Sequence, residues 1–435
     1  MKLLLLVLLV KSVVVASDPR VDPGYDCDYC QPEQVHISFG TKTNNIVVTW
    51  TTYNDTRESR VQYGQGAMDQ EAVGHSTLFT DGGKLRRKMW IHRTLLPDLK
   101  FNTRYVYHVG SVYGWSEMFT FKTPPSGEDW VVRAAIYGDM GNKNAHSMSY
   151  LQDEVQREHF DVILHVGDFA YDMDTDDARV GDEFMRQLQP LAAYLPYMTC
   201  PGNHESKYNF SNYRNRFSMP GAASSLYYSF DLGPVHFVSI STEVYYFLQY
   251  GLKLLVNQYE WLRRDLEQAT RPENRAARPW IVIFGHRPMY CSADRPDCFM
   301  NRLPNRAGLP LLGFGLEPLL KEFGVDLVIW AHEHSYERTW PLYDGQVYKG
   351  LQEPYLNPRA PVHIVTGSAG CQEDTDKFQP HPPAWSAFRS SDYGYTRFAA
   401  HNRTHLYIEQ VDVDLKGQVI DSVWIVKDLH APYDL

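Results

Sequence analysis

The chain has 435 residues, which is more than one ordinary domain needs and enough for two. Hydrophobic residues make up 43% of it and charged residues 22%, so a sizeable core is expected and an intrinsically disordered chain is excluded. The formal net charge of -10 argues against a nucleic-acid surface, which needs a basic stripe, but not against a phosphate substrate, because bound metals can supply local positive charge.

Residues 1–17 have the pattern of a signal peptide. Lys2 precedes an apolar run that Lys11 interrupts, and the small residues Ala16 and Ser17 suit cleavage. The alternative is an uncleaved anchor, but the run is shorter than the about 20 residues that a membrane span needs. We therefore expect a protein of the secretory route, either secreted or lysosomal, that has no membrane segment after cleavage.

The cysteines and the glycosylation signals agree with that route. Six cysteines, an even number, suit an oxidising compartment. Cys291 and Cys298 close a short loop and are the best disulfide candidates, whereas Cys27 and Cys30 either bridge locally or pair elsewhere. Three sequons predict N-glycans on surface loops, at Asn54, Asn209 and Asn402.

Residues 30–123 alternate apolar and polar side chains over short segments that turn residues separate. The strand candidates are Val35–Phe39, Ile46–Thr52, Arg60–Tyr63, Met89–Leu95, Arg104–Val109 and Met118–Lys122. Strands at this spacing indicate a β-sandwich. Because no Cys…Trp…Cys arrangement is present, a fibronectin-III-like sandwich fits better than an antibody domain. Residues 124–130, which begin with two prolines, are the expected linker.

In residues 131–428 the sequence pattern is different, because expected strands alternate there with expected helices. The strand candidates are Val131–Tyr137, Asp161–Val166, Tyr197–Cys200, Trp280–Phe284 and Val325–Ile329. The helix candidates are Ser147–His159, Gly181–Tyr194, Gln258–Ala269 and Leu316–Phe323. The stretch from Pro361 onward is mostly strands. This alternation predicts an α/β domain whose ligands lie at the carboxyl ends of its strands.

Five short blocks of metal-ligand residues fall at expected strand ends. They are Gly138-Asp139-Met140-Gly141, Gly167-Asp168-Phe169-Ala170-Tyr171, Gly202-Asn203-His204-Glu205, Gly285-His286 and Ala331-His332-Glu333-His334. Each ligand alone has an ordinary explanation as a turn former or a polar surface residue, but five blocks in order describe a two-metal site. Aspartate oxygens together with histidine nitrogens suit iron, zinc or manganese better than calcium. His332 and His334 are two residues apart, so in an extended segment both imidazoles can face one pocket.

In this order the blocks resemble the purple acid phosphatases of the metallophosphoesterase superfamily. The N-terminal sandwich resembles the long form of that family, known from plants and animals. The resemblance implies an α/β metallophosphoesterase-type β-sandwich flanked by helices and preceded by the fibronectin-III-like domain. It also implies two metal sites that share Asp168. Their ligands would be Asp139, Asp168, Tyr171 and His334 for the first site, and Asp168, Asn203, His286 and His332 for the second.

Tyr171 is the ligand that favours ferric iron. A free phenol has a pKa of about 10, so it ionises at low pH only against a strongly charged cation. The resemblance therefore implies Fe(III) in the first site and Fe(II), Zn(II) or Mn(II) in the second, with a metal-bound hydroxide as the nucleophile. It further implies that His204 contacts the phosphate and protonates the leaving alcohol. The alternative role for His204 is to orient Asn203 or the bridging carboxylate.

The sequence departs from the family pattern in two places. Ala331 stands where the last block usually has glycine. Plant long forms carry further histidines in the loop after the metal-binding histidine, and residues 287–298 contain none. Arg295 lies at about the right distance along the chain to supply the missing positive charge. We regard it as a candidate substrate-binding residue.

The predicted function is that of a secreted acid phosphatase that hydrolyses small phosphate monoesters. One alternative is a phosphodiesterase or nucleotide pyrophosphatase of the same superfamily. A protein Ser/Thr phosphatase is disfavoured, because that family continues its second block with Asp-Arg-Gly, whereas this chain has Tyr171-Asp172-Met173. A catalytically silent binding protein is a further alternative. The complete set of ligand side chains argues against it.

Overall fold

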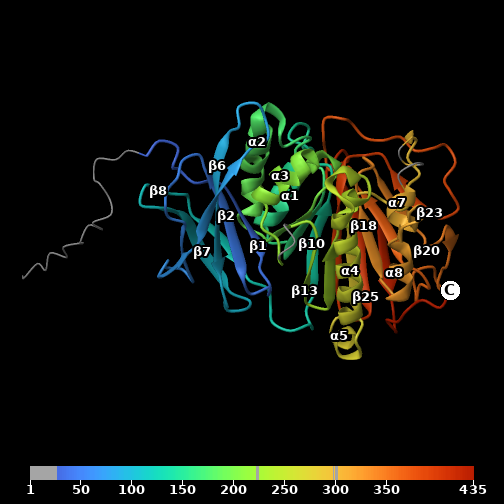
Figure 1. The fold of residues 1–435 in the computed structure, drawn as a ribbon. Helices are drawn as coiled ribbons and strands as arrows, with labels where there is room; N and C mark the ends of the chain where they lie inside the picture. Colours follow the sequence, from blue (N-terminus) through green and yellow to red (C-terminus); the bar gives the residue numbers. More distant parts are fainter. Residues whose placement is uncertain (1–26, 222–224, 297, 299–301) are drawn as a thin grey trace, which may run out of the picture.

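The computed structural model describes residues 27–221, 225–296, 298 and 302–435 (Figure 1). The predicted signal peptide, residues 1–17, lies outside these ranges. Among the described residues, no helix is both long enough and apolar enough to cross a membrane. Cys27 is bridged to Cys30 and Cys291 to Cys298, so the disulfide expected in the short loop is confirmed.

The first domain is a sandwich of two antiparallel sheets. One sheet has the order β1-β2-β6-β5, and the other β4-β3-β7-β8 with β9 beside β7. The strands are β1 Glu33–Phe39, β2 Ile46–Thr52, β3 Arg60–Gly64, β4 Gln70–Val73, β5 His75–Thr80, β6 Lys88–Leu96, β7 Arg104–Ser111, β8 Gly114–Trp115 and β9 Phe119–Lys122. The predicted strands are therefore all present. β4 and β5 were not predicted, because they are mostly exposed and lack a clear apolar alternation.

Two further sheets stack face to face in the second domain. A six-stranded sheet has the order β12-β11-β10-β24-β25-β26, and a seven-stranded sheet the order β13-β14-β15-β18-β22-β19-β23. The strands near the site are β10 Val132–Tyr137, β11 Val162–Val166, β12 Tyr197–Cys200, β14 Val235–Ser239, β15 Trp280–Phe284, β18 Leu327–Trp330 and β22 Val362–Thr366. The others are β13 Tyr228–Leu232, β19 Tyr336–Thr339, β23 Ser386–Ser390, β24 Gly394–Ala400, β25 His405–Asp412 and β26 Gln418–Val426. Short hairpins are formed by β16 Gly308–Leu309 with β17 Gly313–Phe314, and by β20 Leu342–Tyr343 with β21 Gln346–Val347.

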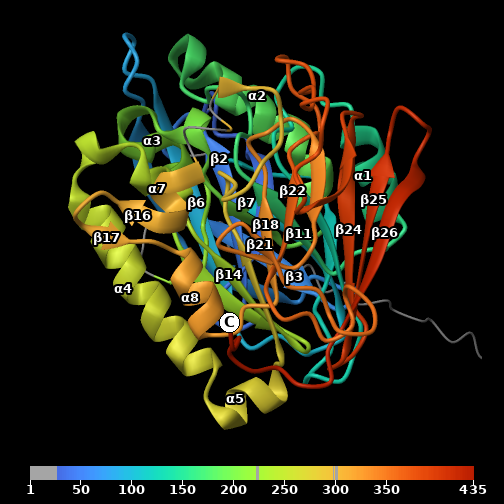
Figure 2. The ribbon, with the colours of Figure 1, turned by 90° about the vertical axis from the view of Figure 1, so that its right-hand side faces the viewer.

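Helices cover the outer faces of the stacked sheets. They are α1 Met148–Gln156, α2 Thr175–Ala192, α3 Lys207–Arg216, α4 Leu252–Ala269, α5 Pro272–Ala277, α7 Arg302–Ala307 and α8 Glu317–Glu322. Figure 2 shows α4 and α8 on one side of the strands and α1 on the other. β15 illustrates this layering. It is buried along its whole length, because one of its faces packs on the other sheet and the opposite face packs on a helix. Val282 and Phe284 enter the core between the sheets, whereas Ile281 and Ile283 pack with Leu262 of α4.

Several predicted boundaries differ from the structure. α2 begins at Thr175 rather than near Gly181, and its first turn contains residues with positive φ, which break the regular pattern. α4 begins at Leu252 rather than near Gln258, because its first turn is exposed and gives no apolar stripe. α3 was not predicted. It carries Asn209, so the expected position of that sequon on a surface loop was wrong.

The sandwich domain packs against α2 and α3 through buried polar groups. The Arg216 guanidinium donates to Asp182 Oδ1 at 2.8 Å and to Gln34 Oε1 of β1 at 3.2 Å. Arg87 reaches the other oxygen of Asp182 at 2.6 Å. Both helices are therefore held between the two domains. This matters for the site, because each helix follows one of the predicted ligand blocks.

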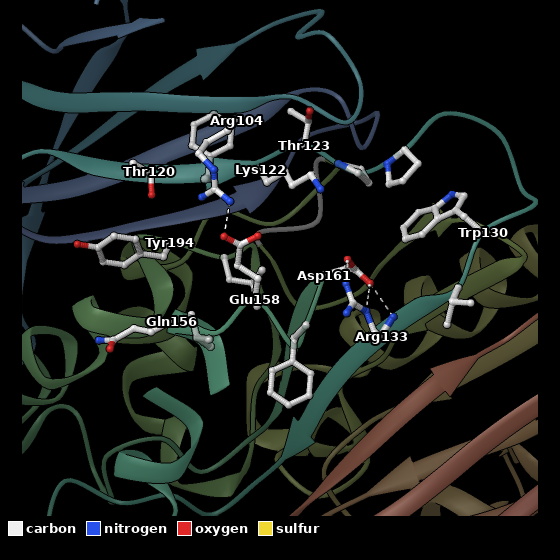
Figure 3. A pocket seen from close by; sticks show the side chains of 17 residues that line it. Arg104, Thr120, Lys122, Thr123, Trp130, Arg133, Gln156, Glu158, Asp161 and Tyr194 are labelled. Carbon is white, nitrogen blue, oxygen red and sulfur yellow. Dashed lines mark hydrogen bonds and ion pairs between the residues drawn. The ribbon is translucent and has the colours of Figure 1, made fainter. Parts of the chain in front are cut away.

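A cleft of about 540 Å³ opens beside the linker, between the two domains (Figure 3). Arg104 of the sandwich pairs there with Glu158 of the second domain, and Arg133 pairs with Asp161 at 3.3 Å. The aromatic side chains of Trp130 and Tyr194 also line the cleft. None of the predicted metal ligands lines this cleft, so it is separate from the candidate site.

Candidate metal centre

The five ligand blocks come together at one edge of the stacked sheets. β10, β11 and β12 run parallel, as do β15 and β18, so the loops that follow them leave each sheet on the same side. The first three blocks follow strands of the six-stranded sheet. His286 and the His332 block follow β15 and β18 of the seven-stranded sheet. The site thus lies where the carboxyl ends of both sheets meet, as expected for ligands of an α/β domain.

Two of the glycines in these blocks are required by close packing. A Cβ atom at Gly167 would lie 2.5 Å from Nδ1 of His286, and φ is +85° there. A Cβ atom at Gly202 would lie 2.1 Å from Oδ1 of Asp168. Any side chain at either position would displace a candidate ligand. This explains why the blocks carry glycine directly before the polar residue.

Asp139, Tyr171 and His334 form the first group of donors. The Tyr171 hydroxyl lies 3.2 Å from Asp139 Oδ1 and 2.7 Å from His334 Nε2. Nδ1 of His334 lies 2.9 Å from the carbonyl oxygen of Asp374, which accepts a hydrogen bond from the ring N–H. That hydrogen bond leaves the Nε2 lone pair directed toward Asp139 and Tyr171. An imidazole fixed in this way is a typical metal ligand.

Asp168, Asn203, His286 and His332 form the second group. Nε2 of His286 lies 3.0 Å from Asp168 Oδ2 and 3.2 Å from Asn203 Oδ1. Asp168, His286 and His332 each offer a ligand atom, and these atoms all lie within 4.8 Å of one another. Nδ1 of His286 lies 2.9 Å from the carbonyl oxygen of Val166, so its tautomer is also fixed by the backbone.

The charges of these groups fit bound cations. Asp139 and Asp168 are buried. Burial lowers the pKa of His286, but the carboxylates of Asp168 and Asp139 outweigh it and raise the pKa to about 9. Burial likewise lowers the pKa of His334, and Asp139 and Cys371 raise it to about 12. The cluster therefore attracts positive charge, and metal ions would take the place of these protons.

A second group of possible ligands does not form a metal site. Cys291, Cys298 and Glu333 also lie close together. Both sulfurs are joined in a disulfide, so neither can act as a thiolate ligand.

Glu205 is a structural part of the centre that the sequence interpretation missed. Its carboxylate accepts N–H groups from Asp168 at 2.9 Å, Phe169 at 3.0 Å and Gly202 at 2.8 Å. It therefore ties the loop after β11 to the loop after β12. Burial and the Asp168 carboxylate raise the pKa of Glu205 to about 8. Its place in the Asn203 block is the sequence signal that could have identified it, because tight loops leave backbone N–H groups that need an acceptor.

Comparison with known proteins agrees with this arrangement. Three family models match consecutive parts of the chain: the Purple acid Phosphatase N-terminal domain at residues 32–123, Calcineurin-like phosphoesterase at 132–336, and Iron/zinc purple acid phosphatase-like protein C at 360–422. The chain is 54% identical to acid phosphatase type 7 of Danio rerio, over 92% of this chain and 93% of the relative. The chain belongs to the purple acid phosphatases.

Other relatives extend the comparison. Acid phosphatase type 7 of Homo sapiens is 52% identical over 92% of each chain. Purple acid phosphatase 21 of Arabidopsis thaliana is 32% identical over 86% of this chain and 80% of the relative. The solved structure of a purple acid phosphatase from yellow lupin seeds superposes with a TM-score of 0.76 at 26% identity, covering 92% of this chain and 75% of the lupin chain. The chain is accordingly an acid phosphatase that acts on small phosphate esters.

His204 of this purple acid phosphatase lies where the candidate ligands are open to solvent, a part of the site called the mouth below. Its side chain is 21% exposed, and its Nδ1 lies 3.0 Å from Asp172 Oδ1. Its Nε2 lies 4.0 Å from Asp168 Oδ2, and its ring packs 4.4 Å from that of Tyr171. Burial lowers the pKa of His204, but Asp168 and Asp172 outweigh this and raise it to about 10. The imidazole thus lies beside the candidate metal ligands, with carboxylates that favour its protonated form.

Two arginines lie near the candidate histidine ligands. Arg295, the candidate for the missing charge, pairs with Asp376 at 3.1 Å, and Asp376 accepts the His334 N–H at 2.7 Å. Arg287 was not singled out from the sequence. Its Nη1 lies 2.9 Å from His332 Nε2, and its Nε lies 3.0 Å from a Glu243 oxygen. Its position directly after His286 was the signal that could have identified it.

Proposed function

We propose that this acid phosphatase hydrolyses phosphate monoesters at a dinuclear metal centre. Asp139, Asp168, Tyr171 and His334 would hold Fe(III), and Asp168, Asn203, His286 and His332 would hold Fe(II), Zn(II) or Mn(II). The observation that carries this proposal is the convergence of two buried groups of donor side chains, which include the carboxylates of Asp139 and Asp168. When bound, the two metal ions supply Lewis acidity to the phosphoryl group and lower the pKa of water.

The choice of iron rests on Tyr171 and on the relatives. Burial raises the pKa of the Tyr171 hydroxyl well above 10, and the Asp139 and Asp168 carboxylates raise it further. Its ionisation therefore requires a strongly charged cation, which favours Fe(III). An Arabidopsis thaliana relative, 28% identical over 94% of this chain, is named an Fe(3+)-Zn(2+) purple acid phosphatase. The matching C-terminal model is also described as iron/zinc.

The residues around the centre would position the loops and supply the proton. Glu205 holds the loop of Asp168 and the loop of Gly202 together. Asp172 orients the His204 ring through a hydrogen bond to Nδ1. His204 would then present a proton on Nε2 to the oxygen of the leaving alcohol. The alcohol would then leave as the neutral species.

Replacing Tyr171 with phenylalanine tests this assignment. We expect the purified wild-type protein to contain iron and to absorb in the visible range, because a phenolate bound to Fe(III) has a charge-transfer band. Tyr171→Phe should lose that band while its circular dichroism is unchanged. Metal analysis and the visible spectrum of both proteins measure this. A wild-type protein without bound iron and without a visible band would overturn the assignment.

A comparison of substrates tests the reaction. We expect turnover of p-nitrophenyl phosphate to exceed turnover of bis-p-nitrophenyl phosphate on the same sample. A diester preference would replace the monoesterase proposal by a phosphodiesterase of the same superfamily.

We also propose that the protein follows the secretory route to the lysosome or the extracellular space. The disulfides Cys27–Cys30 and Cys291–Cys298 support an oxidising compartment. Asn402 is exposed, and Asn54 is partly exposed, so both sequons are accessible to glycans. Expression in animal cells, with detection in the medium and a mass shift after endoglycosidase treatment, is the expected result. Retention of an unglycosylated chain in the cytosol would contradict it.

A further inference from the structure

Two carboxylates that are not candidate metal ligands flank the mouth of the site. Asp172 Oδ1 lies 3.0 Å from Nδ1 of His204, and Glu373 Oε1 lies 4.0 Å from its Nε2. The side chains are 54% and 43% exposed. Among the described residues, neither of these carboxylates forms an ion pair with lysine or arginine. Beside His204 these two carboxylates outnumber the single positive charge of its protonated imidazole, so a net negative charge remains there.

The arginines beside the site already have carboxylate partners of their own. Arg287 pairs with Glu243 at 3.0 Å, and Arg295 pairs with Asp376 at 3.1 Å. Both are less exposed than Glu373, with side-chain exposures of 10% and 33%. Neither arginine is therefore paired with Asp172 or Glu373, which are the more exposed charged groups beside His204. The sequence suggested that Arg295 supplies positive charge to the substrate, and that role stays a prediction.

The position of Glu373 determines which part of a substrate it meets. In the proposed function, the phosphate lies against the metal ligands and the leaving oxygen faces Nε2 of His204. The alcohol then extends past that nitrogen toward solvent, where Glu373 lies. A cationic group on the alcohol is attracted there, and an anionic group is repelled.

We propose that the Glu373 carboxylate makes this enzyme select phosphate monoesters of amino alcohols, whose ammonium group lies about three bonds from the ester oxygen, over esters with an anionic alcohol. Asp172 adds to the same negative field, but it also holds His204. Glu373 lies farther from His204 than Asp172 does, so it is the specificity-determining residue whose replacement disturbs the proton donor less, and turnover of p-nitrophenyl phosphate measures any remaining effect on His204. The inference rests on the proposed placement of the phosphate beside His204.

The test compares kcat/KM for three substrates of similar size on the metal-loaded, full-length protein. These are phosphoethanolamine, glycerol 3-phosphate and 3-phosphoglycerate, with cationic, neutral and anionic alcohols. We expect the wild type to prefer them in that order. Glu373→Gln should reduce the preference for phosphoethanolamine over 3-phosphoglycerate about fivefold, the size of one exposed ion pair. Glu373→Lys should reverse the preference.

A matched control changes the same residue type far from the mouth. Glu267 is an exposed glutamate of α4, and Glu267→Gln should leave the preference as in the wild type. Raising the salt concentration to about 1 M should weaken the wild-type preference, because exposed charges are screened. A structural effect of the Glu373 variants would show neither charge reversal nor salt dependence.

The outcomes separate this inference from the proposed function. Hydrolysis of p-nitrophenyl phosphate and metal content are measured on every sample. If the wild type hydrolyses that ester but prefers 3-phosphoglycerate, or if Glu373→Lys keeps the wild-type order, the selectivity proposal is wrong and the metal centre stands. If no metal-dependent hydrolysis is found, the proposed function itself fails.

Discussion

Ala331 is the residue at which this chain departs from the family pattern inside the ligand blocks. The structure shows where its methyl group fits. A Cβ atom on Gly138 would lie 2.3 Å from Cβ of Ala331 and 3.0 Å from the carbonyl oxygen of Val166. Ala331 is buried, so its methyl group occupies space that Gly138 leaves open. The two positions are thus coupled, and each limits the size of the other.

Gly138→Ala should therefore destabilise the protein, by about 1–3 kcal/mol as in other overpacked cores. In an Ala331→Gly background the same change should cost less, because the closer of the two contacts is gone. Urea denaturation of the wild type, both single variants and the double variant measures the coupling energy. Additive effects of the two changes would show that the methyl groups do not compete for this space.

At the scale of elements, His236 joins a strand pair to a helix. It lies on β14, with Nδ1 2.7 Å from Asp231 of β13 and Nε2 2.9 Å from Asp265 of α4. Burial lowers the pKa of His236, but the hydrogen bonds to both carboxylates outweigh it and raise the pKa to about 9. The charged imidazolium therefore stabilises the contact between α4 and the edge of the seven-stranded sheet.

This link predicts a pH dependence of stability. Since the folded-state pKa of about 9 exceeds the ordinary value of 6.5, the stabilisation is complete below pH 6.5 and is lost as the pH rises through 9. The shift corresponds to at most about 3 kcal/mol. The free energy of unfolding, measured by denaturation between pH 6 and 10, should fall for the wild type and fall less for His236→Gln. Equal pH profiles for the two proteins would rule out this role.

The elements also show which parts of the fold the sequence could predict. The buried strand β15 is an uninterrupted apolar run and only Thr199 interrupts that of β12, and the predicted ranges of both coincide with the observed ones. The ligand blocks could be recognised because they directly follow such strands. The positions of Glu205 and Arg287 in or next to these blocks mark them as candidates, but their contacts, like those of Glu373, could not be derived from the sequence, because they depend on loops from different strands meeting. The exposed strands β4 and β5 lack a pattern for a similar reason, since their faces are not buried.

At the scale of the whole molecule, the sandwich domain supports the site from outside. α2 begins shortly after Tyr171 and Asp172, and α3 shortly after His204. Arg216, the last residue of α3, is buried and donates to Ala178 and Asp182 of α2 and to Gln34 of β1. The sandwich domain is therefore connected, through two helices, to the segments that carry candidate ligands and the proton donor.

Arg216→Met should accordingly destabilise both domains together. Losing one partner of a buried ion pair costs about 3–5 kcal/mol, because Asp182 is left with less compensation. Arg104→Met is a suitable control, since the Arg104–Glu158 pair across the domain cleft is about half exposed and should contribute under about 1 kcal/mol. Guanidinium denaturation followed by circular dichroism and tryptophan fluorescence measures both. Comparable losses in the two variants would refute a special role for the buried network.

The candidate ligands come from both stacked sheets, Asp139, Asp168 and Asn203 from one and His286 and His332 from the other. Under the proposed assignment, a metal ion in the second site is bonded to both sheets at once. Unfolding either sheet then breaks its coordination, so metal uptake and folding form a single linked equilibrium. The concentration of available metal in the compartment where the chain folds thus contributes to the stability of the catalytic domain as well as to its chemistry.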